Sequence, residues 1–171
     1  MKKLFFAALL LFGMTSFSSF AQSEITVSDP DIEFRITKPN GWKIYDDELY
    51  YLIYKPSLKN AYVSITYFEV TERTDLEEDF KFALAYLLPR NNEGYKVVGT
   101  GDEIIDGEKA KWVKYHSKFQ EADQLNVYFM FEKNNQLFKI LGTAANSDFE
   151  SVEEDLLETI KSLKSKKIQL D

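Results

Sequence analysis

The sequence predicts a single α+β domain built on an antiparallel β-sheet of about six to seven strands, together with two helices. Several segments show the period-two alternation of half-buried strands, and two others show the period of amphipathic helices. Short polar turns join consecutive strand segments in the second half of the chain, which is typical of an antiparallel meander. The length of 171 residues suits one domain, and no internal repeat or low-complexity linker divides the chain.

Residues 1–21 have the pattern of a secretory signal peptide. Two lysines precede the uninterrupted apolar run Leu4–Phe12, and small residues precede a cleavage site between Ala21 and Gln22. The apolar run is about half as long as the ~20 residues that a membrane-spanning helix requires. We therefore expect a bacterial protein whose residues 22–171 form one exported domain, periplasmic or secreted, without a transmembrane anchor after cleavage.

Strands are expected in the first part of this domain. Apolar residues alternate with polar ones over 25–27 and 32–36, and a Pro-Asn-Gly turn follows. The run 49–54 (LYYLIY) is apolar on both faces, as expected of a strand that is covered on both sides. The run 61–70 is rich in β-branched and aromatic residues, which favour strands.

The first helix is expected to begin at a capping box formed by Thr74 and Glu77, in which each side chain bonds the backbone amide of the other residue. Pro89 should end the helix, because proline lacks the amide proton that a helix interior needs. The apolar residues between them fall on one buried stripe: Leu76, Phe80, Ala83, Leu84 and Leu87.

Further strands and a second helix are expected after the first helix. The strands cover four runs that short links connect: 95–105, 109–119, 125–131 and 136–143. Asp106-Gly107 is the strongest hairpin signal among these links. Ser147 and Glu150 form a second capping box. The last helix then buries a second apolar stripe: Phe149, Val152, Leu156, Ile160 and Leu163.

Composition argues against several chemistries. The chain has no Cys, which rules out disulfides, thiolate catalysis and Cys-based metal sites. Its formal net charge of −7 and the absence of a basic run argue against nucleic-acid binding, because that affinity depends on neutralising phosphates. No nucleotide-binding, metalloprotease or serine-hydrolase motif occurs, so the sequence predicts no cofactor, no metal site and no catalytic residue.

His116 is the only histidine, and it stands in the middle of an expected strand. A histidine is the most versatile acid–base group near neutral pH, but no sequence pattern supplies a carboxylate partner. Ser117 should point to the opposite face of the strand, so the two residues do not form a dyad. We keep His116 as a candidate contact for a ligand or partner, with a packed or surface position as the alternative.

Aromatic side chains supply the other candidate contacts. Five of them crowd one short stretch, which is either an aromatic recognition groove or an aromatic core between covered faces: Trp42, Tyr45, Tyr50, Tyr51 and Tyr54. Trp42 and Tyr45 are the candidate contacts if the stretch is a groove. Phe82 and Tyr86 are four residues apart on the first helix, away from its buried stripe. Another part of the chain covers this pair, or a partner or second copy docks on it.

Several short motifs resemble those of the PsbP-like proteins. Residues 34–42 read F-x-I-x-x-P-x-G-W, which is similar to the opening strand and turn of that superfamily. The hairpin at Asp106-Gly107 fits its middle, and Leu137–Thr143 with the last helix fits its ending. The resemblance covers about residues 32–164 and extends to DcrB-like and Mog-type members. It implies an α/β/α sandwich with helices on both faces of the sheet, and a binding, assembly or accessory role.

The leading hypothesis is therefore an exported, non-catalytic accessory or binding protein whose partner is an envelope protein. The alternative is a carrier of a small molecule or lipid, with an aromatic-lined pocket between sheet and helix. A pocket of about 300 Å³ or more would favour the carrier. A hydrolase that uses carboxylates or His116 is the third hypothesis.

Overall fold

The computed structural model describes residues 23–29, 32–47, 50–70 and 75–166. The predicted signal peptide, its cleavage site between Ala21 and Gln22, and Thr74 of the first predicted capping box lie outside the described residues.

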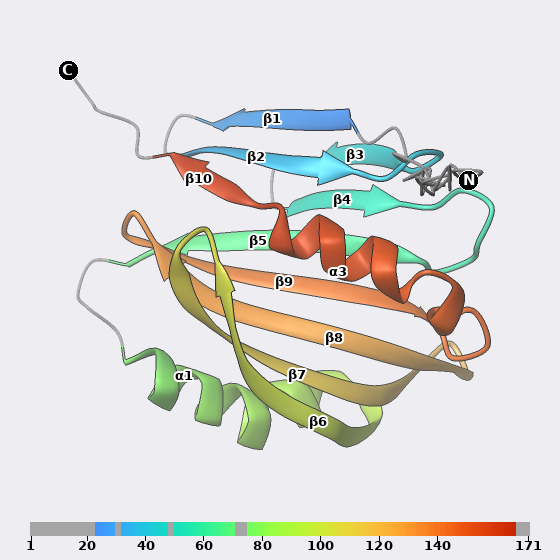
Figure 1. Cartoon of the computed structure of the whole chain (residues 1–171). Helices are drawn as coiled ribbons and strands as arrows, with labels where there is room; N and C mark the ends of the chain where they lie inside the picture. Colours follow the sequence, from blue (N-terminus) through green and yellow to red (C-terminus); the bar gives the residue numbers. More distant parts are fainter. Residues whose placement is uncertain (1–22, 30–31, 48–49, 71–74, 167–171) are drawn as a thin grey trace, which may run out of the picture.

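A seven-stranded antiparallel sheet forms the centre of a single α+β domain, which confirms the predicted fold class (Figure 1). Its strand order is β3-β4-β5-β9-β8-β7-β6. The bounds of these strands are β3 (Lys43–Asp47), β4 (Tyr50–Tyr54), β5 (Tyr62–Glu69), β6 (Glu93–Ile105), β7 (Glu108–Phe119), β8 (Ala122–Lys133) and β9 (Gln136–Ala145). The predicted hairpin joins β6 to β7, with positive φ angles at Asp106 and Gly107 as a type I′ turn requires.

A second, three-stranded sheet was not expected. It has the order β1-β2-β10 and consists of β1 (Ser23–Asp29), β2 (Ile32–Lys38) and β10 (Lys164–Lys166). The sequence pattern predicts the first two strands without indicating the strand that pairs with them, and it predicts no strand after the last helix. Asp106 helps to hold β10, because its carboxylate accepts a hydrogen bond from the Ser165 amide at 2.9 Å.

The first helical segment is longer and less regular than the sequence predicts. It consists of α1 (Leu76–Phe82), a π-helical turn η1 (Ala83–Leu87) and α2 (Leu88–Asn91). Pro89 lies in the first turn of α2 and does not end the segment, because the first turn of a helix needs no amide proton there. Asp75 is the N-cap, and its carboxylate accepts hydrogen bonds from the amides of Glu77 and Glu78.

The second predicted capping box does not form. A 3₁₀ turn η2 (Phe149–Ser151) comes first, and α3 (Glu153–Lys161) begins after Val152, whose side chain caps nothing. The buried stripe of this helix is confirmed, since Phe149, Val152, Leu156, Ile160 and Leu163 are all at most 2% exposed.

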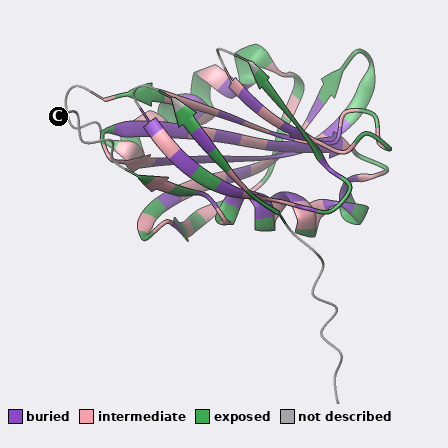
Figure 2. Cartoon of the chain, turned by 90° about the horizontal axis from the view of Figure 1, so that it is seen from above, coloured by how far each residue is buried: buried purple, intermediate pink, exposed green. Residues whose placement is uncertain are grey.

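Two apolar clusters lie on opposite faces of the seven-stranded sheet. Alternate residues of β8 point to opposite faces: Val127, Phe129 and Phe131 belong to one cluster, and Tyr128 and Met130 belong to the other. We call these the α3 face and the α1 face. Figure 2 shows buried residues concentrated along the strands between the outer layers.

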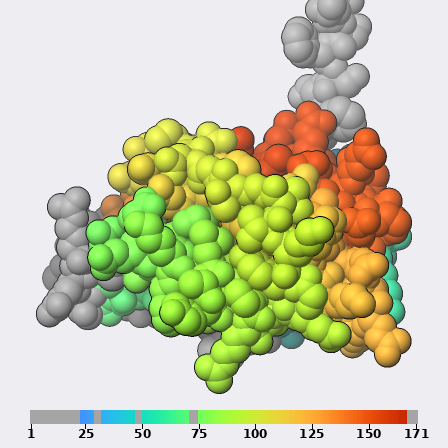
Figure 3. All heavy atoms as spheres, turned by 90° about the horizontal axis from the view of Figure 1, so that it is seen from below, coloured from blue at the N-terminus to red at the C-terminus, as the bar shows by residue number. Residues whose placement is uncertain are grey.

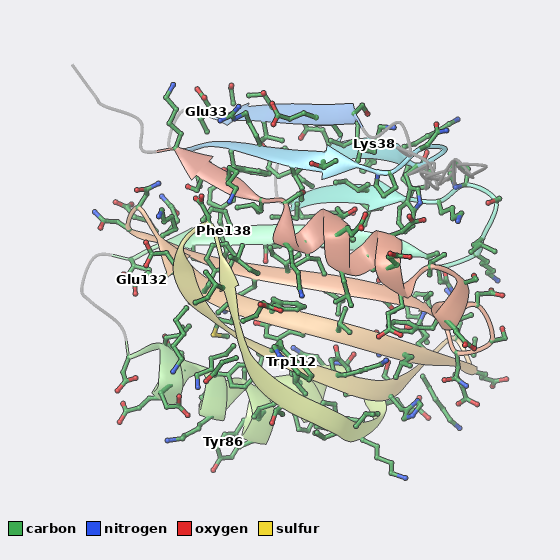
Figure 4. The ribbon with its side chains drawn as sticks, in the orientation of Figure 1. Glu33, Lys38, Tyr86, Trp112, Glu132 and Phe138 are labelled. Atoms are coloured by element: carbon green, nitrogen blue, oxygen red, sulfur yellow. The ribbon has the colours of Figure 1, made fainter. Side chains whose placement is uncertain are left out.

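The α3 face is covered by α3 and by the three-stranded sheet (Figure 1). Leu156 and Ile160 of α3 and Phe34 of β2 are fully buried in this cluster. Phe138 of β9 lies between these elements, and its ring stacks on that of Phe131 with centroids 4.9 Å apart (Figure 4). This cluster is the larger core of the domain.

On the α1 face, the helical segment lies over the β6 end of the sheet. Helix α1 packs against β7 and β8, and α2 packs against β6. Phe80 and Ala83 are buried against Tyr115, Tyr128 and Met130. Figure 3 shows this side from below, where the segment lies directly beside β6.

An ion-pair cluster fixes α1 to the β6–β7 hairpin. Lys111 Nζ lies 2.7 Å from Asp102 Oδ1 and also pairs with Glu77 of α1, while Lys109 adds a second contact to Asp102. The hydrogen bond from Lys111 lowers the pKa of both carboxyl groups below their ordinary values of 4.5 for Glu77 and 3.8 for Asp102. The same two carboxylates raise the pKa of Lys111.

We expect this cluster to make stability depend on pH in the acid range. A lowered carboxyl pKa contributes stability that is present above the ordinary pKa and is lost as the pH falls through the folded-state pKa. Chemical denaturation measures the free energy of unfolding at about pH 6 and at about pH 3. The decrease between these two pH values should be smaller for Lys111→Met than for the wild type. Equal losses in the two proteins would contradict a contribution from the cluster.

Candidate binding surface

The aromatic stretch before and within β4 divides between the two faces of the sheet. Tyr51 and Ile53 of β4 are buried in the α3-face core, whereas their neighbours on the α1 face are only half-buried. The sequence pattern had predicted cover on both sides of this strand, and the structure corrects this for its α1 side. Strand β5 shows the same alternation: Val63 and Ile65 are fully buried, and the residues between them are not.

The residues of β3, β4 and β5 that lie on the α1 side, half-buried or exposed, together form one aromatic surface. Tyr54 lies opposite Tyr62 across the β4–β5 pair, and Tyr45 lies opposite Leu52 across the β3–β4 pair. Tyr45 and Phe68 are the most exposed members, each with 51% of its surface accessible. We call this surface the tyrosine face, and it consists of Tyr45, Tyr50, Leu52, Tyr54, Tyr62 and Phe68.

Polar groups stand between the rings of the tyrosine face. Ser64 and Thr66 lie between Tyr62 and Phe68 on the same side of β5 and are half-buried. Lys43 of β3 is opposite Tyr54 and is exposed. The ammonium group of Lys139 on β9 lies 4.7 Å from the centroid of the Phe68 ring, a favourable cation–π contact. The surface therefore offers aromatic rings, hydroxyl groups and ammonium groups together.

A buried polar row supports the tyrosine face at its inner edge. Tyr62 is opposite Thr143 of β9, whose hydroxyl donates to Asn126 Oδ1 at 2.7 Å. The amide of Asn126 donates in turn to Ser117 Oγ at 2.8 Å. Burial raises the pKa of Tyr62, and the nearby Tyr50 raises it further, so the hydroxyl of Tyr62 stays protonated as a donor at neutral pH.

The tyrosine face occupies the half of the α1 face that lies beside the helices. The helical segment packs on β6, β7 and β8 at one end of the strand order, and β5, β4 and β3 are at the other end. Aromatic residues on this second half are therefore left partly accessible. Tyrosine is well suited to such a position, because its ring is apolar and its hydroxyl is polar.

Two other predicted contact residues do not belong to this surface. Trp42 is 2% exposed and lies in the α3-face core, where its indole N–H donates to Asp155 Oδ2 at 3.1 Å. His116 is half-buried and pairs in register with Leu125, on the α3 side of the sheet. Ser117 is buried on the opposite face, as the alternation predicts.

Phe82 and Tyr86 form a separate exposed pair on the outside of the helical segment. They are 59% and 66% exposed, and their ring centroids are 5.5 Å apart. Figure 4 shows Tyr86 at the rim of the molecule, directed away from the sheet. The described residues therefore leave the pair largely accessible, and a partner contact there stays a prediction.

Two clefts lined by described residues adjoin α3, and carboxylates are prominent in both linings. One, of about 430 Å³, is lined by Pro39, Asn40, Lys55, Ser151, Glu154, Asp155 and Glu158. The other, of about 460 Å³, is lined by Glu150, Glu153, Glu154, Leu157, Glu158 and Lys161. Both exceed the volume that we expected of a carrier, but neither has an aromatic lining or lies between the sheet and a helix.

Within the described ranges, no helix has the length and apolar character needed to cross a membrane. In the same part of the chain, no group of three or more histidine, aspartate and glutamate side chains is arranged to hold a metal ion.

The fold is shared with several solved structures. Cyanobacterial PsbP (CyanoP) from Synechocystis sp. PCC 6803 superimposes with a TM-score of 0.64 and 10% identity, over 91% of this chain and 99% of that one. LpqN from Mycobacterium tuberculosis, described as involved in cell envelope biogenesis, gives a TM-score of 0.61 and 12% identity over 85% of this chain and 91% of that one. A mutant form of Mog1 gives a TM-score of 0.53 and 9% identity over 83% of this chain and 94% of that one.

These similarities show that the chain has the PsbP/Mog-like fold, which confirms the resemblance seen in the sequence. At such low identity they show the fold alone. No protein-family model and no curated protein sequence matches the chain.

Proposed function

We propose that this chain is an exported, non-catalytic binding protein that holds its partner on the tyrosine face. The PsbP-like fold supports an accessory role, since one protein with this fold is described as involved in cell envelope biogenesis. Export rests on the pattern of residues 1–21. Intact-mass measurement of protein from the cell envelope tests it: the mature chain should begin at Gln22, and retention of Met1–Ala21 would contradict export.

One observation carries the assignment of the surface. Buried neighbours fix β4 and β5 rigidly, while the intervening tyrosines, a leucine and a phenylalanine remain partly accessible on one continuous face. Exposed aromatic residues on a rigid scaffold are typical of binding surfaces, because they offer large contact area with little side-chain entropy to lose. A contiguous apolar patch is also unusual on a protein that binds nothing.

A binding role also agrees with the position of the single histidine. His116 lies on the α3 side of the sheet, so it cannot act on a molecule bound at the tyrosine face. The rings and hydroxyls of that face can orient a partner, and the raised pKa of Tyr62 keeps its hydroxyl protonated, so it cannot serve as a general base at neutral pH.

Site-specific photo-crosslinking in the intact envelope tests the assignment. A photoreactive residue at Tyr45 should form adducts, because Tyr45 lies on the proposed surface. The same residue at Ile44 is a matched control: Ile44 is adjacent and 38% exposed, but the strand alternation directs it to the other face. Adducts from Ile44 alone would contradict the proposal.

Phe82 provides a second position for the same measurement. Its pair with Tyr86 is the other exposed aromatic surface that we predicted as a contact. Adducts from Phe82 together with none from Tyr45 would show that the partner binds at α1, and would overturn the assignment to the tyrosine face. Adducts from Tyr45 with few from Phe82 would support it.

A further inference from the structure

The chemistry of the tyrosine face indicates the class of molecule that it binds. We propose that the partner is an acidic polysaccharide, whose sugar rings stack on the tyrosines and whose carboxylates meet the lysines. This inference rests on the proposed function and adds the identity of the partner class. It follows from three properties of the surface: its shape, its hydrogen-bonding groups and its charge.

The shape of the surface suits an extended chain of rings. The tyrosine face is one side of three neighbouring strands, with Tyr54 and Tyr62 side by side across a strand pair and Tyr45 on the next strand. A pyranose ring presents an apolar face of C–H groups that packs flat against an aromatic ring. Successive sugars of an extended polysaccharide can therefore contact successive tyrosines, without the deep pocket that a small ligand needs.

The hydrogen-bonding groups complement the hydroxyl rim of a sugar. Four of the six members of the face are tyrosines, and Ser64 and Thr66 add hydroxyl groups between Tyr62 and Phe68 on β5. Thr66 Oγ1 already donates to the Lys139 carbonyl at 3.2 Å and keeps its lone pairs as acceptors. A purely apolar partner would leave such hydroxyls without hydrogen bonds on burial, which costs free energy.

The charges favour an acidic partner. Lys43 and Lys139 are the basic residues on this side of β3, β4, β5 and β9, and the β3–β4 register adds one acidic residue, Asp47, opposite Tyr50, so basic residues are in excess there although the formal net charge of the chain is −7. Nucleic acid is also anionic, but its affinity comes mainly from many phosphate contacts, whereas the proposed polysaccharide would bind mainly through its sugar rings and use the lysines only in addition.

Affinity electrophoresis of the exported protein tests this inference, with polygalacturonate as the acidic polysaccharide cast in the gel. Dextran serves as a neutral polysaccharide, polyglutamate as a polyanion without sugar rings, and oligo(dT) as single-stranded nucleic acid. Polygalacturonate should retard the protein, and the other three should retard it much less. Tyr54→Ser and Lys43→Gln should each weaken the retardation about fivefold or more. Tyr86→Ser, on the separate helix surface, is the matched control and should leave it unchanged.

Three outcomes would overturn the inference. They are no retardation by polygalacturonate, equal retardation by polyglutamate or oligo(dT), and retardation that Tyr54→Ser does not change. The crosslinking experiment separates this failure from failure of the proposed function. Adducts from Tyr45 without polygalacturonate binding would keep the tyrosine face as the binding surface and exclude an acidic polysaccharide as its partner.

Discussion

Leu156→Ala is expected to lower the free energy of unfolding by about 2–5 kcal/mol. Leu156 is fully buried on α3, in the cluster that joins this helix to the seven-stranded sheet and to β2. The substitution removes apolar contacts and leaves a cavity that the surrounding β-strands cannot close by a small movement. Equilibrium denaturation in urea measures the change.

Glu154→Ala is the matched control for this prediction. Glu154 is exposed on the same helix, and alanine is a good helix former, so its effect should remain within about 0.5 kcal/mol. A cost near zero for Leu156→Ala would show that α3 is not docked on the sheet as the structure places it.

Gly101→Ala is expected to destabilise the protein by about 1–3 kcal/mol through steric overlap. A Cβ atom at Gly101 of β6 would lie 2.8 Å from three atoms of the Trp112 indole on β7. Trp112 packs against the large core from its partly buried position, so moving its ring costs contacts elsewhere. The loss should appear as a lower denaturation midpoint with an unchanged slope.

Gly99→Ala separates this overlap from a general effect of replacing glycine. Gly99 stands on the same strand, and a Cβ atom there would lie 3.8 Å from the same ring, which is ordinary van der Waals contact. We expect little change in stability from Gly99→Ala. Equal losses from the two substitutions would contradict the close approach of Trp112 to Gly101.

The sequence predicts the parts of the fold that depend on local pattern. The stripe from Phe149 to Leu163 has helical spacing, and each of its members is buried. Asp106-Gly107 specifies a tight hairpin through residues that tolerate positive φ, and the turn forms there. Such features need no knowledge of distant residues, which is why composition and spacing suffice.

Other features depend on contacts that are distant in the sequence. The pairing of β10 with β2 joins Ser165 to Phe34, and no local pattern indicates it. The start of α1 is a local feature in which neighbouring residues offer similar patterns: the Asp75 carboxylate caps the helix, one residue after the position that the sequence pattern favours.

The sequence predicts only some members of the tyrosine face. Tyr45 was a candidate contact, but Tyr62 and Phe68 were missed as members of the same surface. The alternation in 61–70 could have separated them from Val63 and Ile65. The sequence could not show that the helical segment packs over β6, β7 and β8, and that packing leaves β5, β4 and β3 accessible.

Hydroxyl-radical footprinting tests most directly whether the tyrosine face is the binding surface. The labelling of each aromatic residue is compared between protein in its native envelope and the same protein purified alone. We expect Tyr45 and Phe68 to be protected in the envelope, while Phe82 and Tyr86 are labelled equally in both samples. Equal labelling of Tyr45 and Phe68 in the two samples would contradict the assignment.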